Sequence, residues 1–169
     1  MRALILGFAA LLSAGAPRAA GAAGDLIDRA RVMACYQEHI EAREALNCIG
    51  AAAAACQEIH TDQFEGSTTV GIAACLSAET EVWDDVLNTN YGLRRAEMMA
   101  QDAEYGAPLI GRGEALRNAQ RAWIAFRDAE CLRLYSEHQD GTLRSIIGAS
   151  CHLTLTAKRA VDLYLASPE

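Results

Sequence analysis

The chain has 169 residues and a formal net charge of −7, and 51% of its residues are hydrophobic. This length suits one domain with a modest core. The acidic charge argues against binding to nucleic acid or to an anionic membrane surface, and it favours encounter with a basic partner in a salt-dependent way.

Residues 1–22 have the pattern of a secretory signal peptide. Arg2 supplies a positive charge, residues 3–12 are apolar, and the Ala-Gly-Ala tripeptide at 20–22 fits the small-x-small cleavage pattern. The apolar run is too short to span a bilayer. We therefore expect cleavage near the end of this segment, and a periplasmic or secreted location for the mature protein.

The expected mature protein covers residues 23–169 as a single domain without a membrane span. Because the removed segment holds Arg2 and Arg18 and no acidic residue, the mature net charge falls from −7 to −9. All six cysteines lie in the mature part, and an even number behind an export signal is typical of a disulfide framework. Their spacing alone does not select one connectivity. The cysteines are Cys35, Cys48, Cys56, Cys75, Cys131 and Cys151.

Helical periodicity dominates the mature chain, and strand-like alternation is nearly absent. Asp25 is a candidate cap for the first helix. The sequence therefore predicts an all-α fold, a disulfide-stapled bundle of four to five helices. The expected helices cover about residues 25–46, 48–59, 68–103, 114–138 and 143–165.

Two of these helices each carry polar and aromatic side chains at steps of three and four residues, which places each set on one face. We expect Trp123 to face the bundle, and Arg127 to reach across to Asp84 because a planar guanidinium suits a partly buried carboxylate. We interpret the resulting network as structural, since polar core networks can fix the register between helices. Its members are Asp84, Asn88 and Tyr91 on the third helix, and Gln120, Trp123 and Arg127 on the fourth.

No residue pattern points to catalysis or to metal binding. No Cys-x-x-Cys or His-x-x-x-His pair occurs, and disulfide formation would remove the thiolates that bind metals. No serine has a Gly-x-Ser-x-Gly setting, and no phosphate-binding glycine loop is present. We therefore expect no catalytic residue, no metal and no cofactor, and an enzyme is the least favoured class. The acidic cluster on the third helix has the pattern of a solvated face: Glu79, Glu81, Asp84 and Asp85.

Three segments, in order along the chain, carry a resemblance to a known family. They are Ala74-Cys75-Leu76 with Glu79, Trp83-Asp84, Leu87-Asn88 and Tyr91; Leu116 with residues 119–131; and Cys151 with Leu155-Thr156 and Arg159. Over about residues 48–165 the chain resembles the lysozyme inhibitor LprI-like domain, formerly a domain of unknown function. Arg94 departs from the family pattern, which has a leucine there. The resemblance implies a small, exported, helical, disulfide-bonded protein, and one branch of the family is described as inhibiting lysozyme.

The resemblance also favours particular disulfides. Cys131 and Cys151 lie on either side of an expected turn, and a disulfide that closes a loop of this size is worth about 3 kcal/mol. The resemblance favours this pair, and it gives less support to a second pair across a loop at Gly66. The expected pairs are therefore Cys131–Cys151, Cys56–Cys75 and, by elimination, Cys35–Cys48.

The same resemblance implies a protein partner, and a basic lysozyme would be attracted to the acidic chain. Lysozymes of the common animal type carry an acidic catalytic pair in a cleft. Arg112, flanked by Gly111 and Gly113, is our candidate to enter that cleft, and an ordinary solvated loop arginine is the alternative reading. We expect an exported binding protein, with lysozyme inhibition as the specific hypothesis. The alternative is an interaction module of the cell envelope with an unknown protein or peptidoglycan partner, and the oligomeric state is left open.

Overall fold

The computed structural model describes residues 26–41, 44–59, 67–138 and 141–166. No strand occurs in these ranges, so the prediction of an all-α, disulfide-stapled fold is confirmed. The expected signal peptide at 1–22 lies outside the described residues. The elements are α1 (Arg29–His39), the 3-10 helix η1 (Glu44–Cys48), α2 (Ala51–Ile59), α3 (Thr69–Tyr105), α4 (Arg112–Glu137) and α5 (Leu143–Leu165).

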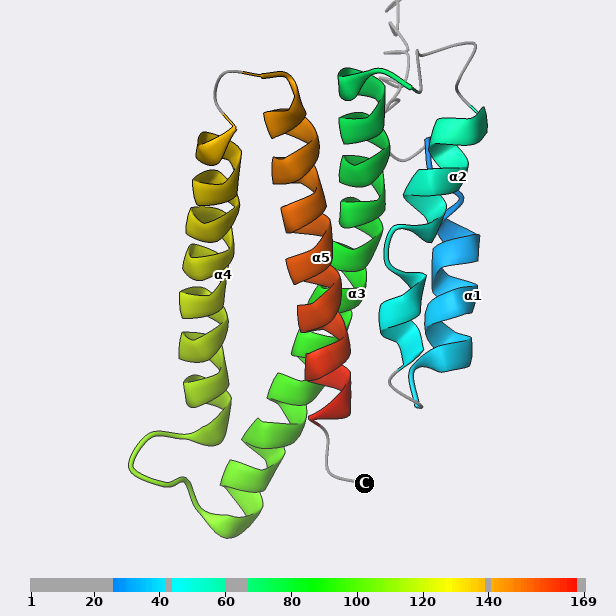
Figure 1. Ribbon diagram of the computed structural model, residues 1–169. Helices are drawn as coiled ribbons and strands as arrows, with labels where there is room; N and C mark the ends of the chain where they lie inside the picture. Colours follow the sequence, from blue (N-terminus) through cyan, green and yellow to red (C-terminus); the bar gives the residue numbers. More distant parts are fainter. Residues whose placement is uncertain (1–25, 42–43, 60–66, 139–140, 167–169) are drawn as a thin grey trace, which may run out of the picture.

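The long helix α3 is the centre of the arrangement (Figure 1). The helix α5 packs most extensively on α3 and next on α4, while α1, η1 and α2 lie together on the other side of α3. The connection between α3 and α4 extends past the C-terminal end of α5 (Figure 1). Within the described ranges, no helix combines the length and the apolar character needed to cross a membrane.

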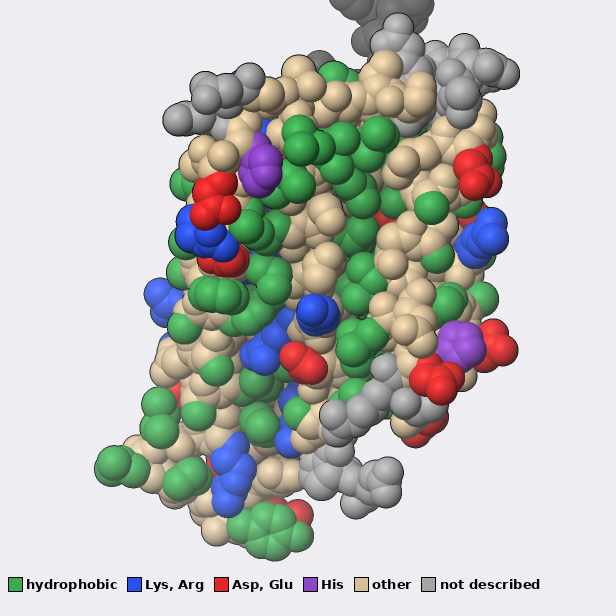
Figure 2. Space-filling view, viewed as in Figure 1, with side chains coloured by type: hydrophobic (Ala, Val, Ile, Leu, Met, Phe, Trp, Pro, Cys, Tyr) green, Lys and Arg blue, Asp and Glu red, His purple; other side chains and the backbone are tan. Residues whose placement is uncertain are grey.

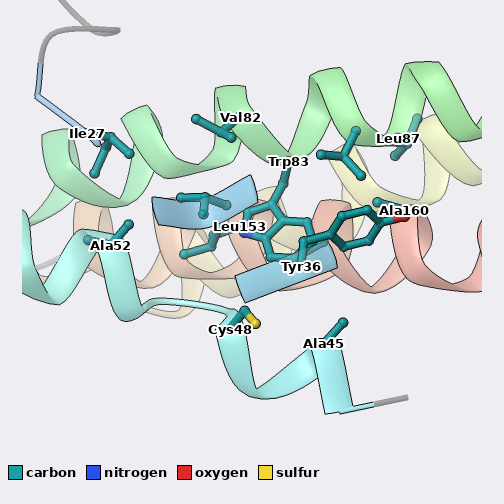
Figure 3. Close-up of a cluster of buried hydrophobic side chains, with 14 of the residues drawn as sticks. Ile27, Tyr36, Ala45, Cys48, Ala52, Val82, Trp83, Leu87, Leu153 and Ala160 are labelled. Carbon is teal, nitrogen blue, oxygen red and sulfur yellow. The ribbon is translucent and has the colours of Figure 1, made fainter. Parts of the chain in front are cut away.

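The side chain of Trp83 in α3 occupies the middle of the core and is completely buried (Figure 3). Its ring meets the ring of Tyr36 edge-on, with 5.8 Å between centroids and 89° between planes. Leu153 and Ala160 of α5 are buried in the same cluster. Helical spacing predicts Trp123 as a core filler, but Trp123 is only partly buried at the edge of this cluster. The physical reason is that α3 is covered from two sides, whereas α4 packs against the bundle from one.

The carboxylate of Glu79 lies inside this core with 0% of the residue exposed. It accepts hydrogen bonds from the backbone N–H groups of Gly50 at 2.8 Å and Ala53 at 2.7 Å, and from the indole Nε1 of Trp83 at 3.0 Å. The two backbone donors belong to the start of α2, so Glu79 caps that helix at the positive end of its dipole. The prediction that Glu79 belongs to a solvated acidic face is therefore wrong, because three donors offset the cost of desolvating the carboxylate.

Three disulfides connect neighbouring elements, and no cysteine in the described ranges is free. They tie η1 to α1, α2 to α3, and α5 to α4. The bonded pairs are Cys35–Cys48, Cys56–Cys75 and Cys131–Cys151, which are the pairs expected from the sequence.

The first helix is shorter than its periodicity predicts. It ends at His39, whereas the pattern continues to about Leu46. An unbroken helix would separate the Cα atoms of Cys35 and Cys48 by about 20 Å, but the disulfide holds them 5.9 Å apart. The segment η1 therefore folds back beside α1, and the predicted helix is incompatible with the disulfide.

Three helix starts also differ from the predicted ones. Asp28 caps α1, and its side chain accepts a hydrogen bond from the backbone N–H three residues on; the predicted cap, Asp25, lies outside the described residues. The helix α2 starts only after Gly50, whose φ of 88° lies in the left-handed region that glycine tolerates best. The helix α4 begins at Arg112 rather than Glu114, which places the candidate arginine in a helix and not in a loop.

Candidate functional site

A groove runs between α3 and α4, and α5 supplies part of its lining. Three adjoining cavities of about 400, 670 and 430 Å³ form this groove. The first two cavities share Asp84 and Arg127 in their lining, and the last two share Ser77, Ala149 and His152. The shared residues make the cavities neighbours along one continuous surface feature that is large enough for a small ligand.

Arg127 lies midway along this groove with 18% of its side chain exposed. Its Nη1 is 3.8 Å from Oδ1 of Asp84, which is an ion pair beyond hydrogen-bonding distance. Its closer contacts are to Oδ1 of Asp128, 2.9 Å from Nε, and to Oγ1 of Thr156, 3.4 Å from Nη1. Arg127 and Asp84, the predicted pair, are thus only weakly paired. The guanidinium of Arg127 instead contacts Asp128 of its own helix and Thr156 of α5.

The remaining predicted partners do not close a single network. Asn88 donates from Nδ2 to Oδ2 of Asp84 at 2.9 Å, within α3. Gln120 is buried and its Oε1 accepts a hydrogen bond from Nε of Arg159 in α5 at 3.0 Å. Tyr91 is half-buried and lines the groove. The network predicted from the sequence does not include Arg159. Its presence in the third segment that carries the family resemblance could have pointed to it.

The ring of Trp123 lies beside two guanidinium groups. The Cζ atoms of Arg127 and Arg159 are 5.3 Å and 5.8 Å from its centroid, within the range of cation–π attraction. Burial lowers the pKa of Arg159, against a smaller opposing effect of Asp162. Burial, and next the charge of Arg127, likewise lower the pKa of His152 against an opposing effect of Asp128, which favours the neutral imidazole.

The groove differs in charge along its length. Its end nearer the α3–α4 connection is lined by three arginines, Arg117, Arg121 and Arg127, and by one carboxylate, Asp84. In the described ranges, no three His, Cys, Asp or Glu side chains are arranged to hold a metal ion. The central cavity carries the acidic residues Glu81, Asp84 and Asp85. The basic end and the acidic middle therefore favour different ligands.

Arg112 does not project towards a partner as a loop arginine would. Its Nη1 donates to Oδ1 of Asp102 at 2.8 Å and to the carbonyl oxygen of Gly106 at 3.2 Å. Burial alone would raise the pKa of Asp102, but the hydrogen bonds from Arg112 and from the N–H of Gly113 hold it below its usual value. Arg112 therefore lies in a helix and pairs at the base of the α3–α4 connection instead of standing free in a loop, and its role in binding a partner stays a prediction.

The side chains that do project at this end of the molecule are apolar. Tyr105 is 72% exposed, Leu109 is fully exposed and Ile110 is 48% exposed. Figure 2 shows hydrophobic side chains at the lower end of the molecule, where Figure 1 places the α3–α4 connection. Exposed apolar groups gathered at one place are typical of a contact surface. Leu109 and Ile110 are not predicted from the sequence as contact residues, although they stand three and two residues before Arg112.

These features define a small all-α domain, stapled by disulfides, with a ligand-sized groove and an exposed apolar loop. The chain belongs to the lysozyme inhibitor LprI family, whose sequence model matches residues 60–163. This match confirms the resemblance expected over about residues 48–165, and it lies within that span.

Two relatives match the chain over about two thirds of its length or more. A protein of Rhizobium meliloti (strain 1021), described as uncharacterised, is 34% identical over 115 residues, which are 66% of this chain and 83% of the relative. An uncharacterised 17.7 kDa protein of Rhodobacter capsulatus is 27% identical over 164 residues, 93% of each chain. No solved structure matches the chain.

Proposed function

We propose that this protein is exported and binds a lysozyme, blocking the active cleft of that enzyme. The observation that carries the proposal is the match of the lysozyme inhibitor LprI family to residues 60–163. Export is supported by the signal-like residues 1–22 and by three disulfides, which persist in oxidising compartments. The net charge of −7 favours encounter with a basic enzyme.

The α3–α4 connection, residues 106–111, is the segment that enters the cleft in this proposal. Leu109 and Ile110 supply exposed apolar surface, and the Asp102–Arg112 ion pair fixes the base of the loop. A loop that is already held in place loses less conformational freedom on binding. Arg112 contributes by positioning the loop, and direct pairing with the carboxylates of the enzyme is the alternative role that mutation tests.

The test is an inhibition assay with the oxidised protein lacking residues 1–22, a basic animal-type lysozyme and a bacterial cell-wall substrate. Inhibition should weaken as salt is added, because the charges that bring the two proteins together are screened. Absence of inhibition by folded, fully oxidised protein at micromolar concentration would reject the lysozyme proposal.

The second candidate is a binding module of the cell envelope whose partner is not lysozyme. The groove between α3 and α4 favours it, because a cavity of about 670 Å³ with polar and charged walls lies apart from the exposed loop. Retention of the protein on isolated cell wall, together with absence of lysozyme inhibition, would support this candidate over the first.

A further inference from the structure

The cavity of about 400 Å³ at the basic end of the groove has a positively charged lining, opposite in sign to the net charge of the whole protein. Arg117, Arg121 and Arg127 line it against a single carboxylate, Asp84, in a chain of net charge −7. Its volume lies within the range of small-ligand sites. Carboxylates outside the lining pair with two of these guanidinium groups, Arg117 with Glu114 and Arg127 with Asp128, so a bound anion would chiefly compensate the charge of Arg121.

Arg121 is the arginine in this cavity whose charge has no partner among the described residues. It makes no hydrogen bond or ion pair with any other residue that the structure describes. Arg117, by contrast, donates from Nη2 to Oε1 of Glu114 at 2.6 Å, and Arg127 is held by Asp128. The guanidinium of Arg121 therefore offers its planar pair of donors to a ligand, and a carboxylate is the group that such a fork fits best.

Gln120 adds a donor from a nearly buried residue to the same cavity. The residue is only 6% exposed, and its Oε1 accepts a hydrogen bond from Arg159 at 3.0 Å. Because arginine can only donate, this bond fixes which end of the amide is oxygen. The Nε2 group is left without a partner in the described part of the chain, although Gln120 lines the cavity. An unpartnered donor at a nearly buried position is stabilised when a ligand oxygen accepts from it.

The remaining wall is apolar and includes two aromatic rings. Leu87, Tyr91, Trp123 and Ile124 form it, and Asn88 stands at the edge. The stretch of α4 from Arg117 to Arg127 rises about 15 Å, which gives room for one or two sugar rings. Apolar surface suits the carbon face of such a ring, while amide and carboxylate side chains suit its hydroxyl groups.

We propose that this cavity binds an acidic saccharide, a sugar ring that carries a carboxylate. The carboxylate binds the guanidinium of Arg121 and the Nε2 of Gln120, and the ring lies against Tyr91 and Trp123. This site is independent of lysozyme binding, because the exposed loop proposed to contact the enzyme does not line the cavity.

The test is a titration of the oxidised protein with N-acetylmuramic acid, followed by tryptophan fluorescence and by calorimetry. The chain has two tryptophans, and Trp83 is completely buried, so Trp123 reports on the cavity. N-acetylglucosamine, which has the same ring without the lactyl carboxylate, is the control ligand. We expect a saturable fluorescence change with N-acetylmuramic acid, weaker at high salt, and affinity for N-acetylglucosamine lower by about tenfold or more.

Two arginine variants on the same helix sharpen the test. Arg121→Gln should weaken binding of N-acetylmuramic acid by about tenfold. Arg133→Gln should leave it unchanged, because Arg133 pairs with Glu130 and Glu137 outside the cavity. Unchanged affinity in Arg121→Gln, equal binding of the two sugars, or inorganic phosphate binding as tightly as N-acetylmuramic acid would each overturn the proposal. The melting temperature of each variant verifies that the fold is retained.

Discussion

The indole Nε1 of Trp83 donates a hydrogen bond to the carboxylate of Glu79, 3.0 Å away, and both side chains are completely buried. The same carboxylate accepts hydrogen bonds from the backbone N–H groups of Gly50 and Ala53. One acidic residue therefore joins the centre of the core to the start of α2. The labelled side chains around Trp83 in Figure 3 show how closely the surrounding elements approach it.

Replacing Glu79 should cost more stability than replacing any exposed acidic residue of α3. In Glu79→Gln one acceptor oxygen remains for three donors, and we expect the free energy of unfolding to fall by about 3 kcal/mol. Denaturant unfolding measures the change. The control is Glu81→Gln two positions on, where the residue is exposed and little change is expected. Similar small losses in both variants would show that Glu79 does not cap α2.

Arg127 should contribute more to stability than Arg121. The side chain of Arg127 contacts Trp123, Asp128 and Thr156, and we expect Arg127→Ala to lower the free energy of unfolding by about 1–2 kcal/mol. Arg121→Ala should change it by less than about 0.5 kcal/mol, because Arg121 has no partner among the described residues. Thermal melting of the two variants gives the comparison, and equal effects would contradict it.

His152 should make the fold sensitive to acid. Burial, and next the positive charge of Arg127, hold its pKa below the unfolded value of 6.5. Between the two pKa values the unfolded chain binds the proton that folded His152 resists, so stability is fully present above pH 6.5 and is lost as the pH falls below it. Unfolding measured from pH 7.5 down to about pH 5 should show this loss. His152→Asn should reduce the slope of stability against pH in that window, and an unchanged slope would assign the loss to other groups.

The exposed loop should decide lysozyme inhibition if the proposed function is right. Leu109→Asp places a charge on a fully exposed apolar side chain and should raise the concentration needed for inhibition by about tenfold or more. Leu132→Asp is the matched control, since Leu132 is 63% exposed on α4 and lies away from the loop. Equal inhibition by both variants would remove the loop from the contact surface.

Arg112→Ala separates the two roles considered for that arginine. If Arg112 only positions the loop through Asp102, then Asp102→Ala should weaken inhibition by a similar factor. If Arg112 pairs directly with the carboxylates of the enzyme, its removal should weaken inhibition strongly while Asp102→Ala, which frees the guanidinium, should not. The inhibition assay on the two variants distinguishes these outcomes.

Much of the local structure follows from spacing along the chain. The periodicity that predicts helices over 68–103 and 143–165 is realised in α3 and α5 within a few residues. A helix depends on contacts three and four residues apart, which are visible in the sequence. The pairing of Cys131 with Cys151, which the family resemblance favours, is also present, and a short turn brings the two helices together.

The candidate sites could not be predicted from spacing along the chain. Arg112 resembles a free loop arginine until Asp102, ten residues earlier in the chain, is placed beside it. Arg121 is exposed, as its place on the outer face of α4 predicts, and it also lines a cavity because α3 passes beside that flank of α4. Such placements depend on how two helices lie next to each other, and no period within one helix encodes them.

The sequence by itself determined the helical class, the disulfide framework and the family of this protein, because periodicity, cysteine content and family motifs are properties of the chain order. Only the tertiary structure decided which of two tryptophans is the centre of the core and which of four neighbouring acidic residues is buried. Trp83 and Glu79 are buried because α1, α2 and α5 close around α3, and Trp123 stays at the edge because α4 is covered on one side. Burial depends on long-range packing, so residues of the same type at similar helical spacing can be buried in one helix and exposed in another.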